Sequence, residues 1–135
     1  MSSFVIADTS VLLAAWHDRD RASLRTVARL LEERRLVTTS VVVAEFLGGE
    51  TTDALAQAQR EDVIAFMPRV LPTSGAAARY AAALRRHRWQ REQRVPAHPD
   101  ALIAGVAAEY DLPVLTLNRR DFVDLPGVRL HPFDD

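Results

Sequence analysis

Short apolar runs alternate along this chain with longer segments of helical periodicity, and this alternation constrains the fold more than any other feature. Short apolar runs between turn residues indicate buried strands, and apolar residues spaced three and four apart indicate helices. Strands that alternate with helices predict a parallel sheet with helices on both faces, which is an α/β fold. The predicted strands cover residues 4–7, 36–38, 69–71 and 114–117, with a last short strand at 128–130.

Capping residues and helix breakers place the helices between these strands. Ser40 and Ser74 suit N-cap positions, and either Thr52 or Asp53 caps the fourth helix. Pro99 suits the first position of the last helix. Three consecutive valines leave a strand open as the alternative for the third segment. The predicted helices cover residues 11–16, 21–34, 41–47, 53–66, 75–90 and 99–110.

The composition is that of one globular domain spanning residues 1–135. Hydrophobic residues make up 48% and charged residues 26% of the sequence, which argues against a disordered chain. The chain has no cysteine, which excludes disulfides, thiolate zinc sites and cysteine nucleophiles. All 17 basic residues are arginine, which excludes lysine bases, Schiff-base chemistry and a phosphate-loop lysine.

Charge and hydropathy limit the partners that the chain can have. No apolar stretch is long enough to span a bilayer, and the N-terminus lacks the pattern of a signal peptide. We therefore expect a soluble cytoplasmic protein with no membrane partner. The net charge is −1, so any nucleic-acid surface must be a local patch.

Acidic side chains follow the ends of two predicted strands. Asp8 comes directly after the first strand, and Asn118 and Asp121 follow the fourth. Asp100 lies in the first turn of the last helix, where the helix dipole favours a carboxylate. Glu45 lies on an otherwise apolar helix, where an acid is costly to bury unless it is paired or bound to a metal. Because sites in parallel sheets form beyond the carboxyl ends of the strands, we expect these side chains at one end of the sheet.

Carboxylates gathered in this way repel one another. At ~4 Å and an effective dielectric of ~20, each like-charge pair costs about 4 kcal/mol. A hard divalent cation offsets this cost: Mg²⁺ prefers oxygen ligands and is often held by carboxylates plus a substrate phosphate, and Mn²⁺ suits the same ligands. Such a site activates water and stabilises charge on a phosphate, so the implied chemistry is phosphodiester hydrolysis.

Four segments carry a family resemblance: VIADTS at 5–10, SVVVAE at 40–45, PDALIA at 99–104 and TLNRRDF at 116–122. Together they resemble the PIN-domain ribonucleases, and the chain length and motif order most resemble the VapC-type toxins of bacterial toxin–antitoxin pairs. The resemblance covers essentially the whole chain. It implies a PIN-like three-layer α/β/α sandwich with a short, mostly parallel central sheet. It also implies an endoribonuclease that depends on Mg²⁺ or Mn²⁺.

The same resemblance implies site residues and partners. Asp8, Glu45 and Asp100 match the metal-binding acids, and the hydroxyls of Ser10 and Thr116 match positions that support the site. The family pattern further implies a homodimer or a toxin–antitoxin hetero-oligomer, with inhibition by a cognate antitoxin of the VapB type.

The fourth site residue is open between two candidates. Many relatives carry aspartate at the position matched by Asn118, and others carry asparagine there with an acid three residues later, which in this chain is Asp121. Asn118 can offer a carbonyl oxygen to a metal, and Asp121 can supply the missing charge as a fourth catalytic acid. We expect one tightly held cation and leave a second open.

Residues 79–98 hold six arginines against one glutamate, a net charge of +5. Arginine pairs with phosphate bidentately, and Trp89 within this segment can stack on a base. The segment leads directly to Asp100, so we interpret it as an RNA-binding surface, with a solvated helix face as the alternative. The predicted RNA-binding residues are Arg85, Arg86, Arg88, Arg91 and, beside Asn118, Arg119.

Plainer interpretations remain open for single acids and for the whole chain. Asp8 and Asp121 can simply cap the turns that follow them, and Asp100 can be a favourable first-turn charge. A non-catalytic PIN-like domain that binds RNA or protein is the alternative function. A magnesium-dependent phosphatase is less favoured, because it needs a lysine and a second aspartate where this chain has Ser10.

Overall fold

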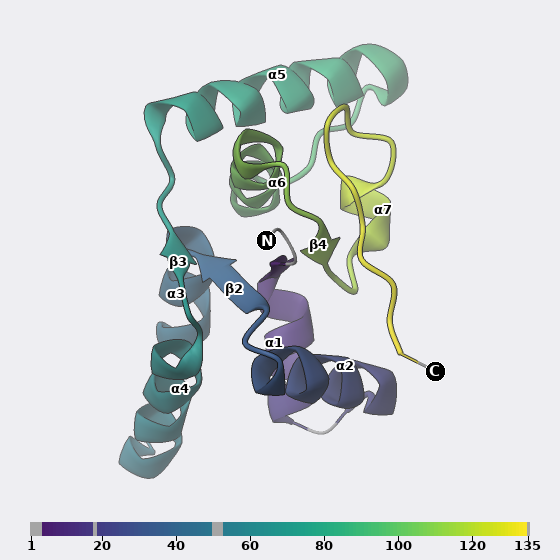
Figure 1. Cartoon of the computed structure of the whole chain (residues 1–135). Coiled ribbons are helices and arrows are strands. Elements are labelled where there is room, and N and C mark those ends of the chain that lie inside the picture. The colour runs from purple at the N-terminus through teal and green to yellow at the C-terminus, as the bar shows by residue number, and fades with distance from the viewer. Residues whose placement is uncertain (1–3, 18, 50–52, 135) are drawn as a thin grey trace.

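Four parallel strands form the central sheet of this protein, which was obtained as a computed structural model that describes residues 4–17, 19–49 and 53–134 (Figure 1). The strands lie in the order β3-β2-β1-β4, and each neighbouring pair is parallel. β1 therefore sits in the middle of the sheet, where its side chains are buried on both faces, as the apolar run predicted. The strands are β1 (Val5–Ala7), β2 (Leu36–Thr39), β3 (Val70–Leu71) and β4 (Val114–Leu115).

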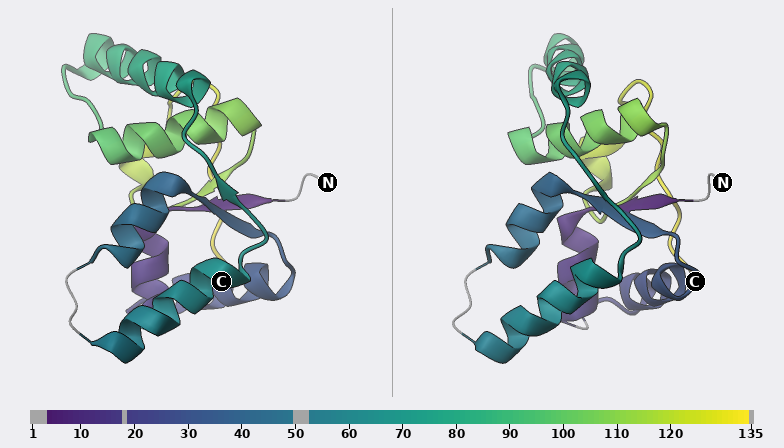
Figure 2. Two further views of the ribbon diagram at one scale, coloured as in Figure 1. Left: turned by 90° about the vertical axis from the view of Figure 1, so that its left-hand side faces the viewer. Right: turned by 60° about the vertical axis from the view of Figure 1, so that its left-hand side comes forward.

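Helices cover both faces of the sheet and make three layers, as Figures 1 and 2 show. One layer contains α5 (Gly75–Glu92), α6 (His98–Tyr110) and the short α7 (Arg119–Phe122). The opposite layer contains α1 (Thr9–Trp16), α2 (Arg21–Glu32) and α4 (Ala54–Phe66). The remaining helix, α3 (Ser40–Leu47), follows β2 directly and contacts α1, α4 and α6. The predicted α/β sandwich is confirmed.

The core lies on both sides of the sheet. Phe46, Leu30 and Ile103 are among its largest fully buried side chains. Gly105 on α6 allows α5 to pack closely, because a Cβ atom there would lie 2.2 Å from the Ala77 carbonyl oxygen. None of the helices in the described part of the chain is long and apolar enough to cross a membrane.

The six predicted helices are confirmed to within two residues at each end, with α6 beginning at His98 and not at Pro99, one N-cap differs, and the short α7 was not predicted. The valine-rich segment forms helix α3 rather than a strand. Its N-cap is Thr39 and not Ser40, because the Thr39 hydroxyl accepts from the Val42 backbone N–H at 3.2 Å. Ser74 caps α5 and Asp53 caps α4 as predicted, while the alternative cap Thr52 lies outside the described residues.

β1 and β3 are each one residue shorter than predicted, and the last two predicted strands differ more. β4 ends at Leu115, because the next backbone N–H groups turn to side chains: Leu117 N–H donates to Ser10 Oγ and Asn118 N–H donates to Thr116 Oγ1. A two-residue strand offers little to pair with. The predicted strand at 128–130 was therefore wrong, and only Leu130 forms a bridge, with Val114.

Candidate active site

The carboxyl ends of β1 and β4 meet at the point where the strand order reverses. From β1 the chain crosses to β2 and β3 on one side of the sheet, and it later returns to β4 on the other side of β1. Crevices at such switch points are the usual binding sites of parallel sheets. The residues that follow these strands are Asp8 and Thr116, and the Asp8 backbone N–H donates to Leu115 O at 3.0 Å.

Asp8 is held from both strands. Its side chain is only 2% exposed. Oδ1 accepts from the Thr9 backbone N–H at 2.7 Å, so Asp8 does cap α1. Oδ2 accepts from the hydroxyls of Ser10 at 3.0 Å and Thr116 at 2.6 Å. The capping interpretation is therefore confirmed, and the two hydroxyls predicted to support the site do contact Asp8.

Glu45 reaches the same region from α3. Its Oε1 accepts a 2.7 Å hydrogen bond from the Thr9 hydroxyl. Thr9 thus touches two acids, since its backbone N–H holds Asp8 and its side chain holds Glu45. The sequence analysis missed this role of Thr9. The only signal was its place in the motif between Asp8 and Ser10.

The side chain of Asp100 is under the electrostatic influence of the other three acids. It lies in the first turn of α6 and is half-buried. Partial burial is the largest cause that raises the pKa of Asp100 from 3.8 to about 7, and the charges of Asp8, Asp121 and Glu45 act in the same direction, along with a hydrogen bond to Asp121. Three carboxylates from three other segments of the chain thus act on this one group. Asp8, Glu45 and Asp121 therefore lie near enough to Asp100 for their charges to raise its pKa.

Asp121 and Asn118 occupy different positions around Asp100. Asp121 lies in the single turn of α7, and its carboxylate faces Asp100. Asn118 is exposed at the start of the same turn, and its backbone N–H donates to Thr116 Oγ1 at 2.9 Å. Asp121 also lies 3.8 Å from Nη1 of Arg94, a neighbour that the sequence analysis did not assign to the site. Of the two candidates for the fourth residue, the geometry favours Asp121.

The donor set suits a hard divalent cation. The side chains here offer carboxylate, hydroxyl or amide oxygens, and the charges of Asp8, Asp121 and Glu45 raise the pKa of Asp100, which is the repulsion that a dication offsets. In residues 4–17, 19–49 and 53–134, no three acidic or histidine side chains already stand close enough to form a complete metal-binding group. The residues fit a hard cation by the chemistry of their oxygen atoms.

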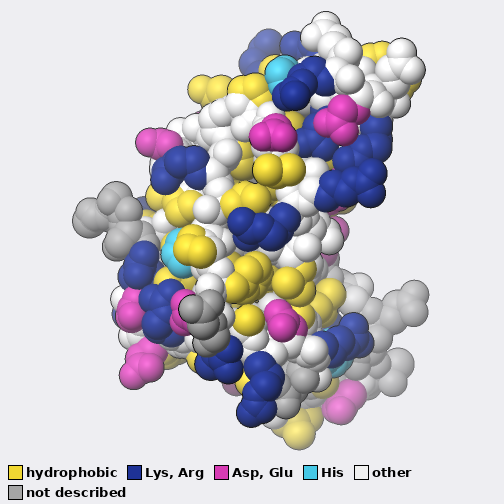
Figure 3. Space-filling view, turned by 90° about the vertical axis from the view of Figure 1, so that its right-hand side faces the viewer, with side chains coloured by type: hydrophobic (Ala, Val, Ile, Leu, Met, Phe, Trp, Pro, Cys, Tyr) yellow, Lys and Arg dark blue, Asp and Glu magenta, His cyan; other side chains and the backbone are white. Residues whose placement is uncertain are grey.

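The basic segment forms a surface beside this site. Figure 3 shows arginine side chains gathered near the top of one face, at the end of the molecule that carries α5 in Figure 1. Arg86, Arg91 and Arg119 are exposed, and Arg85 is partly exposed. The prediction that Arg88 binds RNA was wrong. Arg88 is 3% exposed, and its guanidinium donates to the carbonyl oxygens of Arg120 and Val123 and pairs with Glu92.

Comparison with known proteins places this geometry in a family context. The family model described as PIN domain matches residues 5–128. Similar solved structures include the VapBC2 complex of Rickettsia felis bound to a DNA fragment from its promoter, with a TM-score of 0.79, 18% identity and coverage of 97% of this chain and 99% of that one. DNA-bound VapBC from Salmonella typhimurium has a TM-score of 0.78 and 22% identity, over 95% of this chain and 96% of that one. VapBC-5 from Mycobacterium tuberculosis, a member of the VapBC family of toxin–antitoxin systems, has a TM-score of 0.69 and 27% identity, over 95% and 97% of the two chains. The search of curated proteins found no match.

Proposed function

This chain belongs to the PIN domain family, and from that premise we propose that it is a metal-dependent endoribonuclease that acts as the toxin of a VapBC-type pair. The observation that carries the proposal is that Thr9 hydrogen-bonds both Asp8 and Glu45, while the charges of these two acids and of Asp121 raise the pKa of Asp100. Independent helix caps on separate parts of the surface would not act on one another in this way. Four acids at one switch point instead form a site for a dication and a phosphate.

Each acid has a distinct part in this proposal. Asp8 and Asp100 would hold Mg²⁺ or Mn²⁺ directly, and Glu45 would hold it directly or through water. A bound dication supplies charge neutralisation and water activation for phosphodiester hydrolysis. Asp8 is the most rigidly placed ligand, because three hydrogen bonds fix its carboxylate. Asp121 raises the pKa of Asp100 through its charge and a hydrogen bond, and Asn118 would offer a further oxygen at the edge of the site.

The exposed arginines would bring the RNA to these acids. Arg86, Arg91 and Arg119 are available to phosphates, and Arg94 beside Asp121 links this surface to the acidic site. Phosphate contacts of this kind position the strand without reading its sequence. We propose that the protein acts on RNA in the cytoplasm.

The proposed partners are a second copy of the chain and an antitoxin. Support comes from the fold shared with VapBC toxin–antitoxin complexes over nearly the whole chain. Expression of the chain alone should arrest bacterial growth. Co-expression of a cognate VapB-type antitoxin should relieve the arrest, as should Asp8→Ala.

The direct test is cleavage of single-stranded RNA by the purified protein. We expect internal cleavage with Mg²⁺ or Mn²⁺, no cleavage with EDTA, and loss of cleavage in Asp100→Asn. Asp111→Asn is the matched control, because Asp111 lies at the C-terminus of α6, away from the acids, and pairs there with Arg129. Unchanged cleavage by Asp100→Asn, or cleavage that persists in EDTA, would refute the proposal.

A further inference from the structure

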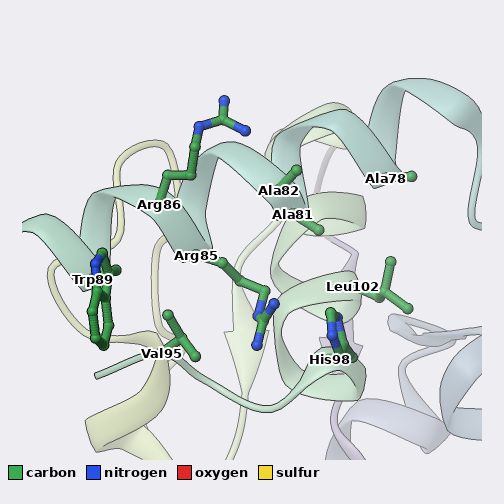
Figure 4. A pocket seen from close by; sticks show the side chains of 9 residues that line it. All are labelled: Ala78, Ala81, Ala82, Arg85, Arg86, Trp89, Val95, His98 and Leu102. Atoms are coloured by element: carbon green, nitrogen blue, oxygen red, sulfur yellow. The ribbon is translucent and has the colours of Figure 1, made fainter. Parts of the chain in front are cut away.

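A groove of about 450 Å³ lies between α5 and the start of α6, outside the acidic site. Figure 4 shows how its side chains are arranged. Trp89 and Val95 stand at one end, His98 and Leu102 stand at the other, and Arg85 extends between them. The nine lining residues include no acid. The groove is therefore lined mainly by apolar side chains, with His98, Arg86 at its edge and Arg85 inside it as the polar members.

Arg85 is held in this groove without a charged partner. Its Nε donates a 3.1 Å hydrogen bond to the Pro96 carbonyl oxygen, which fixes the plane of the guanidinium. No carboxylate of the described residues forms an ion pair with it, whereas Arg88, three residues further along the helix, pairs with Glu92. A guanidinium between apolar walls is most favourable when an anion completes it, and its fork matches phosphate in particular.

Trp89 supplies the second element. It lies four residues after Arg85, so both side chains project from the same face of α5. Its side chain is 55% exposed, which leaves indole surface uncovered within the wall of the groove. Aromatic side chains beside a cationic track are the usual platform on which unpaired bases stack.

We propose that this groove binds one unpaired nucleotide of the RNA, with its base stacked on Trp89 and its phosphate on Arg85. The inference rests on the proposed function and names the state of the substrate that it takes, which is single-stranded. His98 in the groove is two residues before Asp100, so a strand that leaves the groove passes the start of α6, where the acids lie. The net positive charge of the surroundings and the acid-free lining favour RNA over a protein segment.

The test is RNA affinity in EDTA, which separates binding from cleavage. Fluorescence anisotropy with a labelled single-stranded oligoribonucleotide should show that Trp89→Ala and Arg85→Gln each weaken binding about ten-fold or more. Quenching of tryptophan fluorescence by the RNA should disappear in Trp89→Phe. Arg85→Lys, which keeps the charge and loses the planar fork, should lie between Arg85→Gln and the unaltered chain.

Two controls match these variants. Tyr80→Ala removes an aromatic ring of similar exposure from the same helix, outside the groove, and should leave affinity within about two-fold. Arg86→Gln removes the same charge as Arg85→Gln, but Figure 4 shows the Arg86 guanidinium pointing away from the groove. We therefore expect Arg86→Gln to weaken RNA binding less than Arg85→Gln does, through the loss of long-range electrostatic attraction alone. Thermal unfolding of each variant checks that the fold is intact.

Several outcomes would overturn the inference. In one such outcome, Trp89→Ala binds single-stranded RNA as tightly as the unaltered chain does. In another, Trp89→Ala loses as much affinity for duplex RNA, whose bases are not free to stack on Trp89, as for single-stranded RNA. A change in oligomeric state in place of a change in affinity would make the groove an interface between copies. The two proposals can fail separately. If the protein binds RNA through the groove but never cleaves it, only the nuclease proposal is refuted. If the protein cleaves RNA and Trp89→Ala leaves the KM for RNA unchanged, only the groove proposal is refuted.

Discussion

The Thr116 hydroxyl donates a 2.6 Å hydrogen bond to Oδ2 of Asp8 and so joins the ends of two neighbouring strands. Both side chains are buried, and Thr116 Oγ1 also accepts from the Asn118 backbone N–H. One hydroxyl therefore fixes the direction of the Asp8 carboxylate and the start of the segment that carries Asp121. The contact belongs to the fold and to the candidate site at once.

Thr116→Val should consequently affect both stability and activity. Valine keeps the shape and leaves the buried carboxylate without one donor, which should lower the free energy of unfolding by about 2 kcal/mol. RNA cleavage should fall by about 10- to 100-fold, the usual effect of losing a partner that orients a metal ligand. Urea denaturation and cleavage at saturating Mg²⁺ measure the two effects.

Thr26→Val is the matched control for this variant. Thr26 is equally buried on α2, where its hydroxyl donates to Ala22 O and accepts from the Asp134 N–H. It should cost a similar free energy of unfolding and leave cleavage by the folded protein unchanged. Equal loss of cleavage in both variants would mean that Thr116 acts only through stability.

Asp100 should make the metal-free protein sensitive to pH. Its pKa is about 7 in the folded chain against an ordinary 3.8, mainly because of burial and then because of Asp8 and Asp121. The folded state therefore holds a proton that the unfolded state has released between these two values, and stability should fall as pH rises through this window. Asp100→Asn should remove most of this slope and raise the melting temperature at pH 8.

Melting temperatures in EDTA from pH 4 to pH 8 check this expectation. Asp111→Asn, at an exposed position beside Arg129, should keep the slope. Added Mg²⁺ should raise the melting temperature of the unaltered chain at pH 8 and have little effect on Asp100→Asn. A slope as steep in Asp100→Asn as in the unaltered chain would show that Asp100 does not titrate in this range.

Arg88 and Arg91 should differ sharply although both belong to the basic segment. Arg88→Leu removes the donors to two carbonyl oxygens near α7, so it should lower the free energy of unfolding by about 2 kcal/mol or more. Arg91→Gln changes an exposed side chain and should leave stability within about 0.5 kcal/mol. RNA affinity of the folded protein should fall in Arg91→Gln and not in Arg88→Leu. If Arg88→Leu instead weakened RNA binding and left stability unchanged, Arg88 would belong to the RNA-binding surface after all.

The sequence predicted the parts of this molecule that local chemistry determines. Apolar runs and caps give β1, β2 and the long helices, and parallel topology alone is enough to bring Asp8 and Asp121 to one end of the sheet. The sequence could not show that the Thr9 hydroxyl donates to Glu45, because that contact depends on how α3 packs against α1.

Charge runs are less informative than strand ends, for a physical reason. Six arginines on and after one helix necessarily point in different directions, and the pattern does not say which one turns inward. The structure shows that Arg88 is buried over α7, Arg85 lies in a groove and Arg86 points to solvent. Likewise, the short β4 reflects side chains that take over backbone hydrogen bonds, which no propensity contains.

The packing of α5 on α6 gives a further prediction, through two glycines with opposite surroundings. A Cβ atom at Gly105 would lie 2.2 Å from Ala77 O and 3.1 Å from Ala81 N, so Gly105→Ala must push the helices apart. We expect a loss of about 2–3 kcal/mol in the free energy of unfolding. Gly75, at the start of α5, has no atom within 4 Å of the place where a Cβ would stand and no positive φ, so Gly75→Ala should stabilise by about 0.4–1 kcal/mol through the unfolded chain. Because the groove with Arg85 and Trp89 lies between the same two helices, Gly105→Ala should also weaken binding of single-stranded RNA while Gly75→Ala leaves it unchanged. Urea denaturation and anisotropy on both variants check the pair, and a stable, tightly binding Gly105→Ala would show that the helices can separate without cost.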